Sequence, residues 1–571
     1  MKKKIKLQKS IFIFLTLIIS ILIITGCSSS QNKTSSKNNI IIKTVGKGEV
    51  IKQKEGSTTT LTASPEDGYS FFRWDGDLVS TNSPEKVSNL EKKELTAVFI
   101  DKSKKEKGIF KLINSWGNEW GPFGNGSYYI TYEAAIKNNI KAYMFEPKTN
   151  YKPKAIAKFK IKHSLREDIK INIKNEGKEK SLYVDTIDEL YPNNYELKYD
   201  FLQKGGDESF PDNNIILDIT ELLPIENEII LEVENKSNKN GTIENFAVEV
   251  YNDYNDSPKK VYNAKKPPVN LPPYEKKNIT IKNINIKDSV VNSSKFMGLE
   301  NYSRDYTLGD LKNYEIEKNN ETLNNIVEKY ETGLAHLPKE KWKNSLKNGL
   351  IKSIGTANIA ENKEQTNKSI DNSQSKYCPP VTSQGNEGSC VSWASVYYIQ
   401  SYYQAKANGW NLSAENKDNI EKNKLMSPDF IYQLINNGGN NGTTYLDNLV
   451  MLENVGSSTW KNMTPDDSEY TNWGDTEAWK SAAKYRADYP LYKIKISSYA
   501  DIEAIKYLLE QGYIMAVSIN SNKYDQGKSG YADDKGVWTV DNYNTKVTTH
   551  ANTLVGYDDN YDGTVNSITI K

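Results

Sequence analysis

The segment from Pro379 to Tyr403 constrains the fold more than any other part of the chain, because its character changes at one residue. It reads PPVTSQGNEGSCVSWASVYYIQSYY. A polar turn region precedes Cys390, and an apolar run typical of a helix follows it and ends near Asn408–Gly409, a common C-cap pair. Cys390 therefore lies at a helix N-terminus, where the dipole and the free N–H groups stabilise a thiolate. The sequence predicts a nucleophilic cysteine.

A histidine suited to act with this cysteine lies far downstream. The stretch THANTLVGYDD places His550 at the head of a strand-like run, and the chain has only three histidines. The other two, His163 and His336, lie in contexts without catalytic partners. A thiolate attacks carbonyls, and a neighbouring imidazole moves the proton. We expect a Cys390 thiolate and a His550 imidazolium to form the active pair, with a bell-shaped pH profile.

A third pattern lies near the other end of the chain, INSWGNEWGPFGNG at residues 113–126. Together the three stretches resemble the papain family of cysteine peptidases, which has P-V-x-x-Q-G-x-x-G-S-C, H-A-x-x-x-V-G-Y and N-S-W-G-x-x-W-G…N-G segments. The resemblance covers residues 108–133 and 377–571. The matching residues are Pro380, Val381, Gln384, Gly385, Gly388, Ser389 and Cys390, then His550, Ala551, Val555, Gly556 and Tyr557, and finally Asn114, Ser115, Trp116, Gly117, Trp120, Gly121, Asn125 and Gly126.

The resemblance implies an α+β domain, with a helical half and a β-barrel-like half, and a role for each residue. Cys390 would be the nucleophile, and His550 its general base and later the acid for the leaving amine. Asn114 would hold the imidazole at the nitrogen that faces away from the cysteine. The side-chain amide of Gln384 and the Cys390 N–H would form an oxyanion hole, where one donor is typically worth about 3–4 kcal/mol. Trp116 would cover the pair of Asn114 and His550.

The sequence departs from the family pattern beside the nucleophile. The position three before it, often a disulfide cysteine in the family, is Glu387. The common tryptophan directly after it is Val391, with Trp393 two positions further on. Loss of the disulfide bears on stability rather than on chemistry.

The stretch NGGNNGTT, residues 437–444, resembles the glycine strand that pairs with the substrate backbone. Gly442 is kept, and Thr443 stands in place of a second glycine. We expect Gly388, Gly442 and Trp116 to contact the substrate.

The order of the motifs is unusual, since the Asn motif precedes the other two. Residues 377–571 carry the cysteine and the histidine without an Asn motif, and residues 108–133 carry an Asn motif alone. In the family the His and Asn strands are neighbours in one sheet, joined by a short turn. We interpret the order as a circular permutation. Two alternatives are an Asn strand supplied by a second molecule and a broken tandem gene without activity.

The N-terminus resembles a bacterial lipoprotein signal. A basic start is followed by an apolar run at residues 11–24, shorter than a typical spanning helix, and then by ITGC. Residues 1–26 would be removed, and Cys27 would be lipidated and anchor the chain to the outer face of the cytoplasmic membrane. Residues 27–39 form a polar tether. The alternative is an uncleaved anchor helix.

A chain of 571 residues is too long for one core, and its patterns indicate several domains. Residues 40–100 resemble the divergent β-repeat of bacterial surface proteins, with Trp74 and its aromatic neighbours forming a core more readily than a sugar-stacking face. Residues 137–253 alternate as strands of a sandwich and loosely resemble jelly-roll modules. Residues 254–376 read as a linker, in which the helical stretch 308–350 and the polar segment after it form a pro-segment or a passive connector.

A net charge of +1 with both signs interspersed argues against a nucleic-acid protein. No cofactor or metal is expected, because DDNYDG at 558–563 matches only half of an EF-hand loop and reads better as a turn. The third cysteine, Cys378, is expected to be a free thiol or, less readily, a reversible latch to Cys390.

We expect an exported peptidase that acts on proteins or peptides. The alternative is a surface adhesin with an inactive papain-like domain. In either case the β-repeat could contact a cell wall or a host surface.

Overall fold

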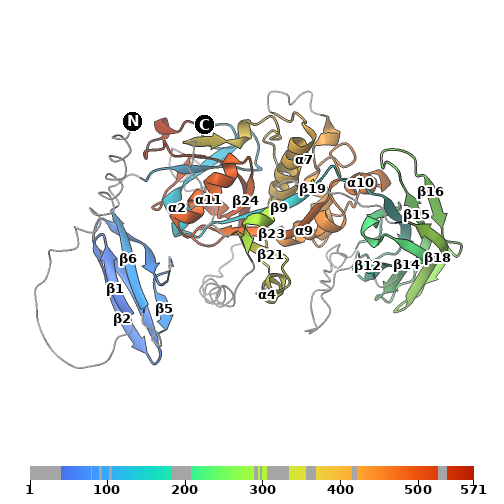
Figure 1. Ribbon diagram of the computed structural model, residues 1–571, viewed down its shortest axis with the longest axis horizontal. Coiled ribbons are helices and arrows are strands. Elements are labelled where there is room, and N and C mark those ends of the chain that lie inside the picture. The colour runs from blue at the N-terminus through green and yellow to red at the C-terminus, as the bar shows by residue number, and fades with distance from the viewer. Residues whose placement is uncertain are drawn as a thin grey trace, which may run out of the picture.

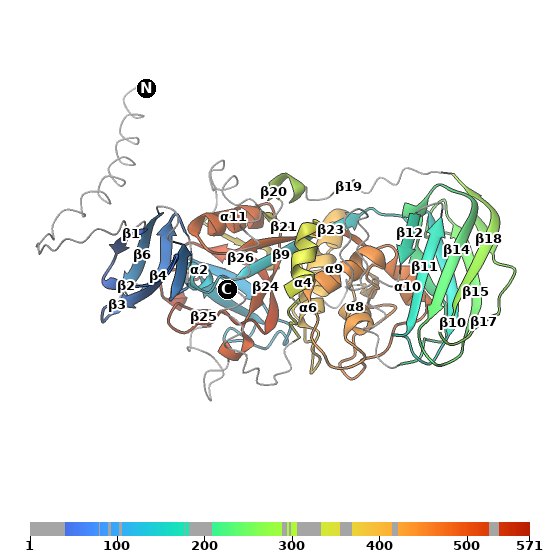
Figure 2. The ribbon, with the colours of Figure 1, turned by 90° about the horizontal axis from the view of Figure 1, so that it is seen from below.

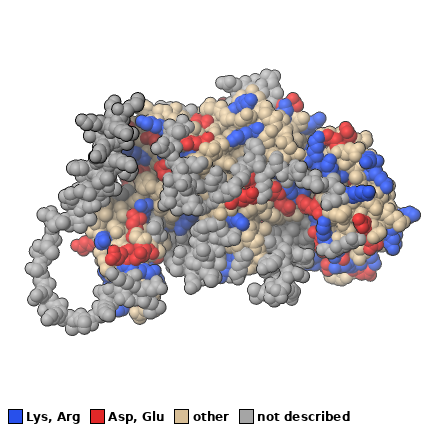
Figure 3. All heavy atoms as spheres, in the orientation of Figure 1, with Lys and Arg blue, Asp and Glu red and all other residues tan. Residues whose placement is uncertain are grey.

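The structure is a computed structural model of the chain. It describes residues 40–78, 80, 82–88, 93–101, 106–175, 178–181, 208–287, 294–295, 299–304, 333–337, 339–354, 368–413, 421–524 and 536–570. The chain is multidomain and built mostly of β-sheets with few helices. The N-terminal module and a two-sheet body lie at opposite ends of a central body (Figure 1). Figure 3 shows basic and acidic side chains mixed over one face, as the near-neutral net charge suggests.

The N-terminal module consists of two three-stranded sheets around a small core. One sheet has the order β1-β6-β4 and the other β2-β3-β5, with β1 parallel to β6. Trp74 is fully buried, and its indole N–H donates to the carbonyl of Asn82. Phe72 is buried too, so both residues belong to cores and not to an exposed stacking face. The strands are β1 (Ile40–Val45), β2 (Gly48–Glu55), β3 (Thr58–Pro65), β4 (Tyr69–Gly76), β5 (Glu85–Ser88) and β6 (Lys93–Asp101).

The central body is organised around one sheet of eleven strands. Its order is β20-β21-β23-β9-β24-β26-β7-β8-β25, with β19 paired to β9 and β22 to β26. The strands are β7 (Ile109–Ile113), β8 (Ser127–Thr131), β9 (Lys141–Thr149), β19 (Ser294–Lys295), β20 (Ser303–Arg304), β21 (Ile351–Ile354), β22 (Ser369–Asp371), β23 (Ala487–Lys495), β24 (Met515–Ile519), β25 (Val537–Trp538) and β26 (His550–Asp558).

Helices cover this sheet and form the second half of the central body. One of them starts at Cys390 and continues through the π-helical η6 to Asn408, where Gly409 takes a left-handed φ of 69° and ends it, as the sequence predicts. The helices are α2 (Tyr132–Lys137), α4 (Lys339–Lys347), α6 (Cys390–Ser392), η6 (Trp393–Gln400), α7 (Ser401–Asn408), α8 (Pro428–Ile435), α9 (Tyr445–Asn454), α10 (Thr476–Ala482) and α11 (Tyr499–Glu510). Short 3-10 turns are η2 (Thr220–Leu222), η3 (Leu299–Tyr302), η5 (Asn372–Gln374), η8 (Lys422–Lys424), η9 (Ser521–Lys523) and η10 (Val565–Ser567).

Two antiparallel sheets pack side by side at the far end of the molecule (Figure 2). One has the order β13-β10-β15-β16 with β17 also on β15, and the other has the order β12-β11-β14-β18. Their strands are β10 (Ala155–Lys162), β11 (Ile169–Asn175), β12 (Lys178–Ser181), β13 (Ile215–Asp218), β14 (Ile225–Asn235), β15 (Gly241–Val250), β16 (Lys260–Asn263), β17 (Val269–Leu271) and β18 (Lys276–Ile286). Alternate residues of β11 are buried, which is the pattern of a strand with one face on a core and one in water.

The structure moves two of the expected boundaries of this sandwich. β9 falls inside the expected range 137–253 but pairs with β23 and β24 in the central sheet. Eight of its nine residues are buried, as in a strand covered on both faces, so it lacks the alternation of the sandwich strands. β18 falls in the expected linker but pairs along its length with β14. The sandwich therefore spans residues 155–286.

A buried ion pair joins the sandwich to the central body. Arg486 Nη1 lies 2.7 Å from Asp218 Oδ2, and both side chains are fully buried. The same guanidinium donates to the carbonyl of Glu453 and contacts the carboxylates of Glu453 and Glu221. Charges at this depth are tolerated only when paired and hydrogen-bonded, so these contacts fix the sandwich in place.

Candidate active site

Cys390 is the first residue of α6, at the start of the helix that continues to Asn408. Ser389 is the N-cap, and the Cys390 side chain is fully buried. The backbone N–H groups of Ala551 and Gly333 hydrogen-bond to its sulfur, which lowers the pKa of the thiol and so favours a thiolate. The nucleophile therefore lies between a helix start, the residue that follows His550 in β26, and a third segment that contains Gly333.

His550 and Asn114 are brought together by strand pairing. β26 and β7 are antiparallel neighbours, and His550 Nε2 lies 2.7 Å from Asn114 Oδ1. The Ser115 N–H also donates to Asn114 Oδ1, which identifies that atom as an oxygen and an acceptor. His550 therefore carries its proton on Nε2. Its Nδ1 is buried without a hydrogen-bond partner among the described residues. That nitrogen retains a lone pair that can accept the thiol proton.

The Asn strand also holds Gln384. The Gln384 N–H donates to the Ser115 carbonyl at 2.7 Å, and the Ser115 hydroxyl donates to Gln384 Oε1. Gln384 Nε2 gives one of its two N–H groups to the carbonyl of Glu387. The second N–H can be given to an oxyanion. Ser115 carried no role in the sequence-based expectations, although it belongs to the quoted motif.

Trp116 covers the histidine. Its ring centroid lies 4.8 Å from that of His550, with the planes inclined by 36°. The backbone of Trp116 forms an antiparallel bridge with Ser383, in the loop before the nucleophile. The indole ring of Trp116 therefore lies against the imidazole of His550.

A short stretch of the chain, residues 333–337, occupies the groove in front of the nucleophile. We call it the covering segment. The Thr443 N–H donates to the Gly333 carbonyl, and the Ala335 N–H donates back to the Thr443 carbonyl, both at 2.9 Å. These bonds make Leu334 and Thr443 a parallel bridge. On the other side the Leu334 N–H donates to the Thr549 carbonyl, next to His550. The covering segment is thus held between Thr443, in the loop before α9, and Thr549, the residue directly before β26.

Gly388 and Gly442, the two glycines expected to contact the substrate, both lie against the covering segment. A Cβ on Gly333 would lie 1.7 Å from the Gly388 carbonyl oxygen, and a Cβ on Gly442 would lie 2.9 Å from the Gly333 carbonyl carbon. Nearby, Asn440 accepts from the Gly388 N–H and donates to the Asn386 carbonyl. These two bonds tie the nucleophile loop to the glycine strand, where the sequence offers no disulfide.

The ionisation of the pair differs from the expected one. Burial raises the pKa of the Cys390 thiol to about 12, and burial lowers the pKa of His550 to about 3. Both groups are therefore neutral at pH 7, and not a thiolate with an imidazolium. The helix start is present, but the desolvation of a closed site outweighs it. The covering segment supplies part of this burial, so the expected ion pair requires an open groove.

The remaining sequence candidates lie elsewhere. Cys378 and Cys390 are both free and buried, so no latch joins them. Asp558 accepts from Asn560 and from Thr569, which gives a closed turn. No group of three or more His, Cys, Asp or Glu within the described part of the chain is arranged to hold a metal ion.

The membrane-related candidates fall outside the structure. Cys27 and the apolar run 11–24 are not among the described residues. Within the residues that are described, no helix has the length and apolar character to cross a bilayer.

Comparison with known proteins assigns one region of the chain. Residues 39–103 match a family described as the divergent InlB B-repeat domain, which confirms the β-repeat expected at residues 40–100. A search of curated proteins finds no significant match to the chain. Among solved structures the chain is similar to xylellain, a cysteine protease from Xylella fastidiosa, with 17% identity and a TM-score of 0.24 over 35% of this chain and 73% of that one.

Proposed function

We propose that the chain is a papain-like cysteine peptidase that hydrolyses peptide bonds through a thioester on Cys390. The observation that carries the proposal is the 2.7 Å contact of Asn114 with His550, made between residues 436 positions apart beside a buried cysteine at a helix start. A structural histidine would not need an acceptor on one ring nitrogen and a vacant lone pair on the other.

The proposed reaction follows from the placement of these groups. His550 Nδ1 takes the thiol proton of Cys390, and the sulfur attacks the peptide carbonyl carbon. The oxyanion receives the second N–H of Gln384 and the backbone N–H of Cys390. The imidazolium then gives its proton to the leaving amine, and the thioester forms as the C–N bond breaks. Water, deprotonated by His550, hydrolyses the thioester and restores the thiol. Asn114 keeps the imidazole in one tautomer throughout.

We further propose that the domain is circularly permuted. Asp558 at the end of β26 pairs with Ile109 at the start of β7, so the two strand ends lie where a hairpin turn would join them. The Gly108 N–H donates to the Tyr561 carbonyl, and the Tyr129 hydroxyl donates to the Ile570 carbonyl. These contacts keep the two strand ends adjacent, which supports the loss of a turn that would join β26 to β7 in an unpermuted domain.

The covering segment is proposed to keep the enzyme latent. Hydrogen bonds to Thr443 and Thr549 occupy backbone groups that a substrate would use, and Cys390 is buried in this state. Activity would require the segment to leave the groove. Residues 305–332, just before it, and most of the expected helical stretch 308–350 lie outside the described residues.

We also propose that the protein is exported and anchored by a lipid on Cys27, on the basis of the N-terminal pattern alone. Globomycin-sensitive processing and incorporation of labelled palmitate test this, with Cys27→Ser as the control. A release of unlabelled wild-type protein into the medium would contradict it.

The activity is tested by labelling with a peptidyl acyloxymethyl ketone followed by mass spectrometry. The label is expected on Cys390 and not on Cys378, and it should be lost in His550→Ala. Equal labelling of wild type and His550→Ala would favour the alternative, a surface adhesin with an inactive papain-like domain. The matched β-repeat is the observation that keeps this alternative in view.

A further inference from the structure

The sandwich turns one of its sides away from the rest of the molecule. Its β13 edge meets the central body through the ion pair of Asp218 with Arg486. β16 and β17 pair with β15 at the opposite edge of that sheet, and β18 is an edge strand of the other sheet. Figures 1 and 2 place β16 and β18 at the outer end of the molecule. This side of the sandwich is therefore accessible to a partner.

Lysines are concentrated on this outer side. Residues 259–287 contain eight lysines and one acidic residue, Glu275, although the whole chain has a net charge of only +1. Figure 3 shows basic side chains along the outer end of the sandwich. A local excess of one sign attracts ligands of the opposite sign. We call these lysines the basic stripe: Lys259, Lys260, Lys265, Lys266, Lys276, Lys277, Lys282 and Lys287.

Strand pairing arranges the basic stripe along the seam between the two sheets. β16, the connection 264–268 and β17 run along β15 from Val250 to Gly241. β18 runs back along β14, and the Tyr262 hydroxyl donates to the Asn285 carbonyl at 3.0 Å across the seam. The order along the seam is therefore Lys259, Lys260 and Lys287, then Lys265, Lys266 and Lys282, and last Lys276 and Lys277.

Six lysines of the basic stripe are available to a ligand. Lys276 and Lys277 already have carboxylate partners. The other six are exposed, and no carboxylate among the described residues forms an ion pair with them, including Glu228, which is opposite Lys282 in the strand register. Lysines on edge strands prevent pairing with another sheet. That role does not explain the four of the six that lie outside strands, which are Lys259, Lys265, Lys266 and Lys287.

The spacing and the type of these cations indicate an extended ligand that repeats its charge. Lys282 and Lys287 are separated by about 17 Å, at about 3.3 Å per residue, so one small anion cannot contact both. Residues 259–287 contain no arginine. Arginine binds anions through a planar fork, whereas the lysine ammonium binds phosphate as a point charge and needs no fixed orientation. Lysines therefore suit the phosphates of a flexible chain.

The aromatic content of this side argues against a nucleic acid as the partner. Surfaces that bind single-stranded nucleic acids offer several aromatic side chains on which the bases stack. The large exposed aromatic side chain described on this side is Tyr274, which lies beside the paired Lys276 rather than among the six available lysines. A phosphate polymer without bases fits this surface better.

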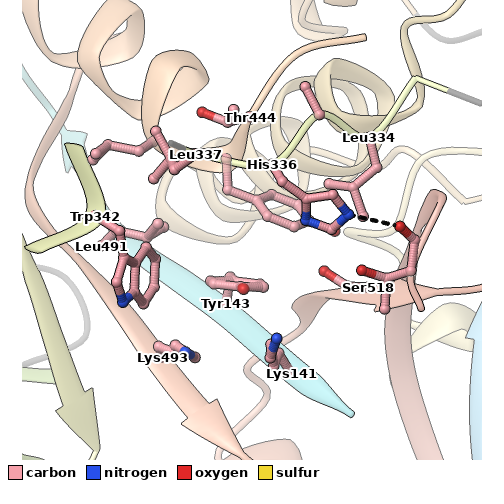
Figure 4. Close-up of a pocket in the computed structure, with 14 residues that line it drawn as sticks. Lys141, Tyr143, Leu334, His336, Leu337, Trp342, Thr444, Leu491, Lys493 and Ser518 are labelled. Atoms are coloured by element: carbon pink, nitrogen blue, oxygen red, sulfur yellow. Dashed lines mark hydrogen bonds between the residues drawn. The ribbon is translucent and has the colours of Figure 1, made fainter. Parts of the chain in front are cut away.

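We propose that the basic stripe binds a linear polymer of phosphate diesters, of the polyol phosphate type, and holds the protein on it. The polymer lies along the seam, and its phosphates meet the six exposed ammonium groups in turn. The candidate active site lies elsewhere, because the covering segment and the cavity that Leu334 and His336 line beside it belong to the central body (Figure 4). Binding to the basic stripe is therefore independent of peptidase activity.

The test measures binding of fluorescent poly(glycerol phosphate) to the full chain by anisotropy at several salt concentrations. Six contacts with a flexible chain should make the logarithm of the association constant fall with that of the salt concentration with a slope of about −4. Lys265→Gln/Lys266→Gln/Lys282→Gln removes three contacts. It should lower the affinity at least about tenfold in low salt and reduce the slope to about −2.

The matched control is Lys54→Gln/Lys422→Gln/Lys461→Gln. It has the same change in net charge, and its three lysines are exposed and lie outside the sandwich. This control should bind the polymer as the wild type does, and circular dichroism checks that both triple variants are folded. Equal weakening in the two variants, or no binding by the wild type, overturns the proposal.

Other polyanions decide which partner the basic stripe takes. Poly(dT), polyglutamate and vesicles of phosphatidylcholine with phosphatidylglycerol are compared with poly(glycerol phosphate) at equal anionic charge. We expect poly(glycerol phosphate) to bind most tightly, and its advantage to be lost in the variant of the basic stripe. Tighter binding of poly(dT) would indicate a nucleic acid, of polyglutamate an acidic protein, and of vesicles a membrane surface. Each of these three results overturns the proposal.

Discussion

Asn114 and His550 lie 436 positions apart in the chain, and a 2.7 Å hydrogen bond joins their side chains. The contact depends on the pairing of β7 with β26, which places β7 between β26 and β8 inside the sheet rather than at its edge. The orientation of the proposed base is therefore decided by a part of the chain that is made first.

Replacing Asn114 should change the orientation of the His550 ring without changing the fold. In Asn114→Ala the His550 ring loses the acceptor that fixes its tautomer, so kcat should fall by about 10- to 100-fold, by analogy with other ligand-orienting partners, while KM changes little. Asn125→Ala, in the same motif but turned to Ser127, is the matched control. Steady-state kinetics with circular dichroism decide the matter. An unchanged kcat in a folded Asn114→Ala protein would remove Asn114 from the mechanism.

The permutation proposal predicts how fragments behave. Residues 377–571 alone should fold poorly and lack activity, because β26 then loses its neighbour β7 and exposes an edge. The fragment 377–571 also lacks β9, which lies between β23 and β24 in the sheet. Fusing residues 108–149, which carry β7, β8 and β9, after Lys571 through a short turn should restore labelling of Cys390, since Asp558 and Ile109 already lie opposite each other. Thermal unfolding and inhibitor labelling of both proteins measure this. A fully active 377–571 fragment would contradict the proposal.

Adding one methyl group at Gly333 should displace the covering segment and so relieve the proposed latency. In Gly333→Ala the new Cβ would meet the Gly388 carbonyl oxygen at 1.7 Å, so the covering segment cannot seat. We expect Cys390 alkylation by iodoacetamide to speed up at least about tenfold at pH 7, because an exposed thiol regains a pKa near 8.5 and its helix start lowers it further. Gly349→Ala controls for general loosening, because its Cβ would meet open space and only its left-handed φ of 68° would be strained.

The pH profile of alkylation gives a second readout of this change. In the covered protein the raised pKa of Cys390 makes the rate climb only well above pH 8.5, as the thiol ionises. In Gly333→Ala the climb should move to lower pH. Identical profiles for the two proteins would rule out the covering segment as the cause of burial.

Glu387 should make stability fall as pH rises. Its pKa is raised to about 9, first by burial and then by the charge of Asp429, whereas in the unfolded chain it titrates near 4.5. Between these values the unfolded chain is ionised at this position and the folded one is not. The folded state therefore loses ~1.4 kcal/mol per pH unit from this group. Glu387→Gln should match wild type near pH 4.5 and exceed it at pH 8 in urea unfolding. A difference that does not vary with pH would refute the assignment.

The buried ion pair of Arg486 and Asp218, which links the sandwich to the central body, should make a measurable contribution to the free energy of unfolding. Asp218→Ala leaves the fully buried Arg486 without its one fully buried carboxylate partner among the described residues and is expected to cost about 3–5 kcal/mol in unfolding free energy. Asp253→Ala, whose partner Lys152 is exposed, should cost less than about 1 kcal/mol. Calorimetry of both variants provides the comparison. Similar losses would show that the buried pair does not hold the sandwich.

The sequence predicts residues whose chemistry is local and misses what depends on distant pairing. Cys390 at its helix start and His550 at the head of a strand follow from patterns within ten residues of each. Residues 333–337 fall within the stretch 308–350 that the sequence left as a pro-segment or a passive connector. Which residues of that stretch lie against Cys390 could not be predicted, because Thr443 and Thr549 bind them through backbone groups that any sequence provides. The place of β9 in the central sheet was missed as well, because its partners β23 and β24 lie more than 300 positions further along the chain.

The closed site departs from the predicted thiolate and imidazolium for a related reason. A helix start stabilises a nearby charge by about 0.3–2 kcal/mol, whereas burial of the thiol shifts its pKa by more than that effect can offset. The helix is visible in the sequence around Cys390. The burial comes from residues more than fifty positions earlier and more than a hundred later.

The order of the three groups along the chain also governs when the site can exist. Ribosomes make proteins from the N-terminus, so the orienting group at residue 114 is made first, the sulfur at residue 390 follows, and the imidazole at residue 550 comes last. A chain whose synthesis has not reached residue 550 has the proposed nucleophile and its orienting asparagine but lacks the proposed base. The proposed site can therefore assemble only after β26 has been made and has paired with β7.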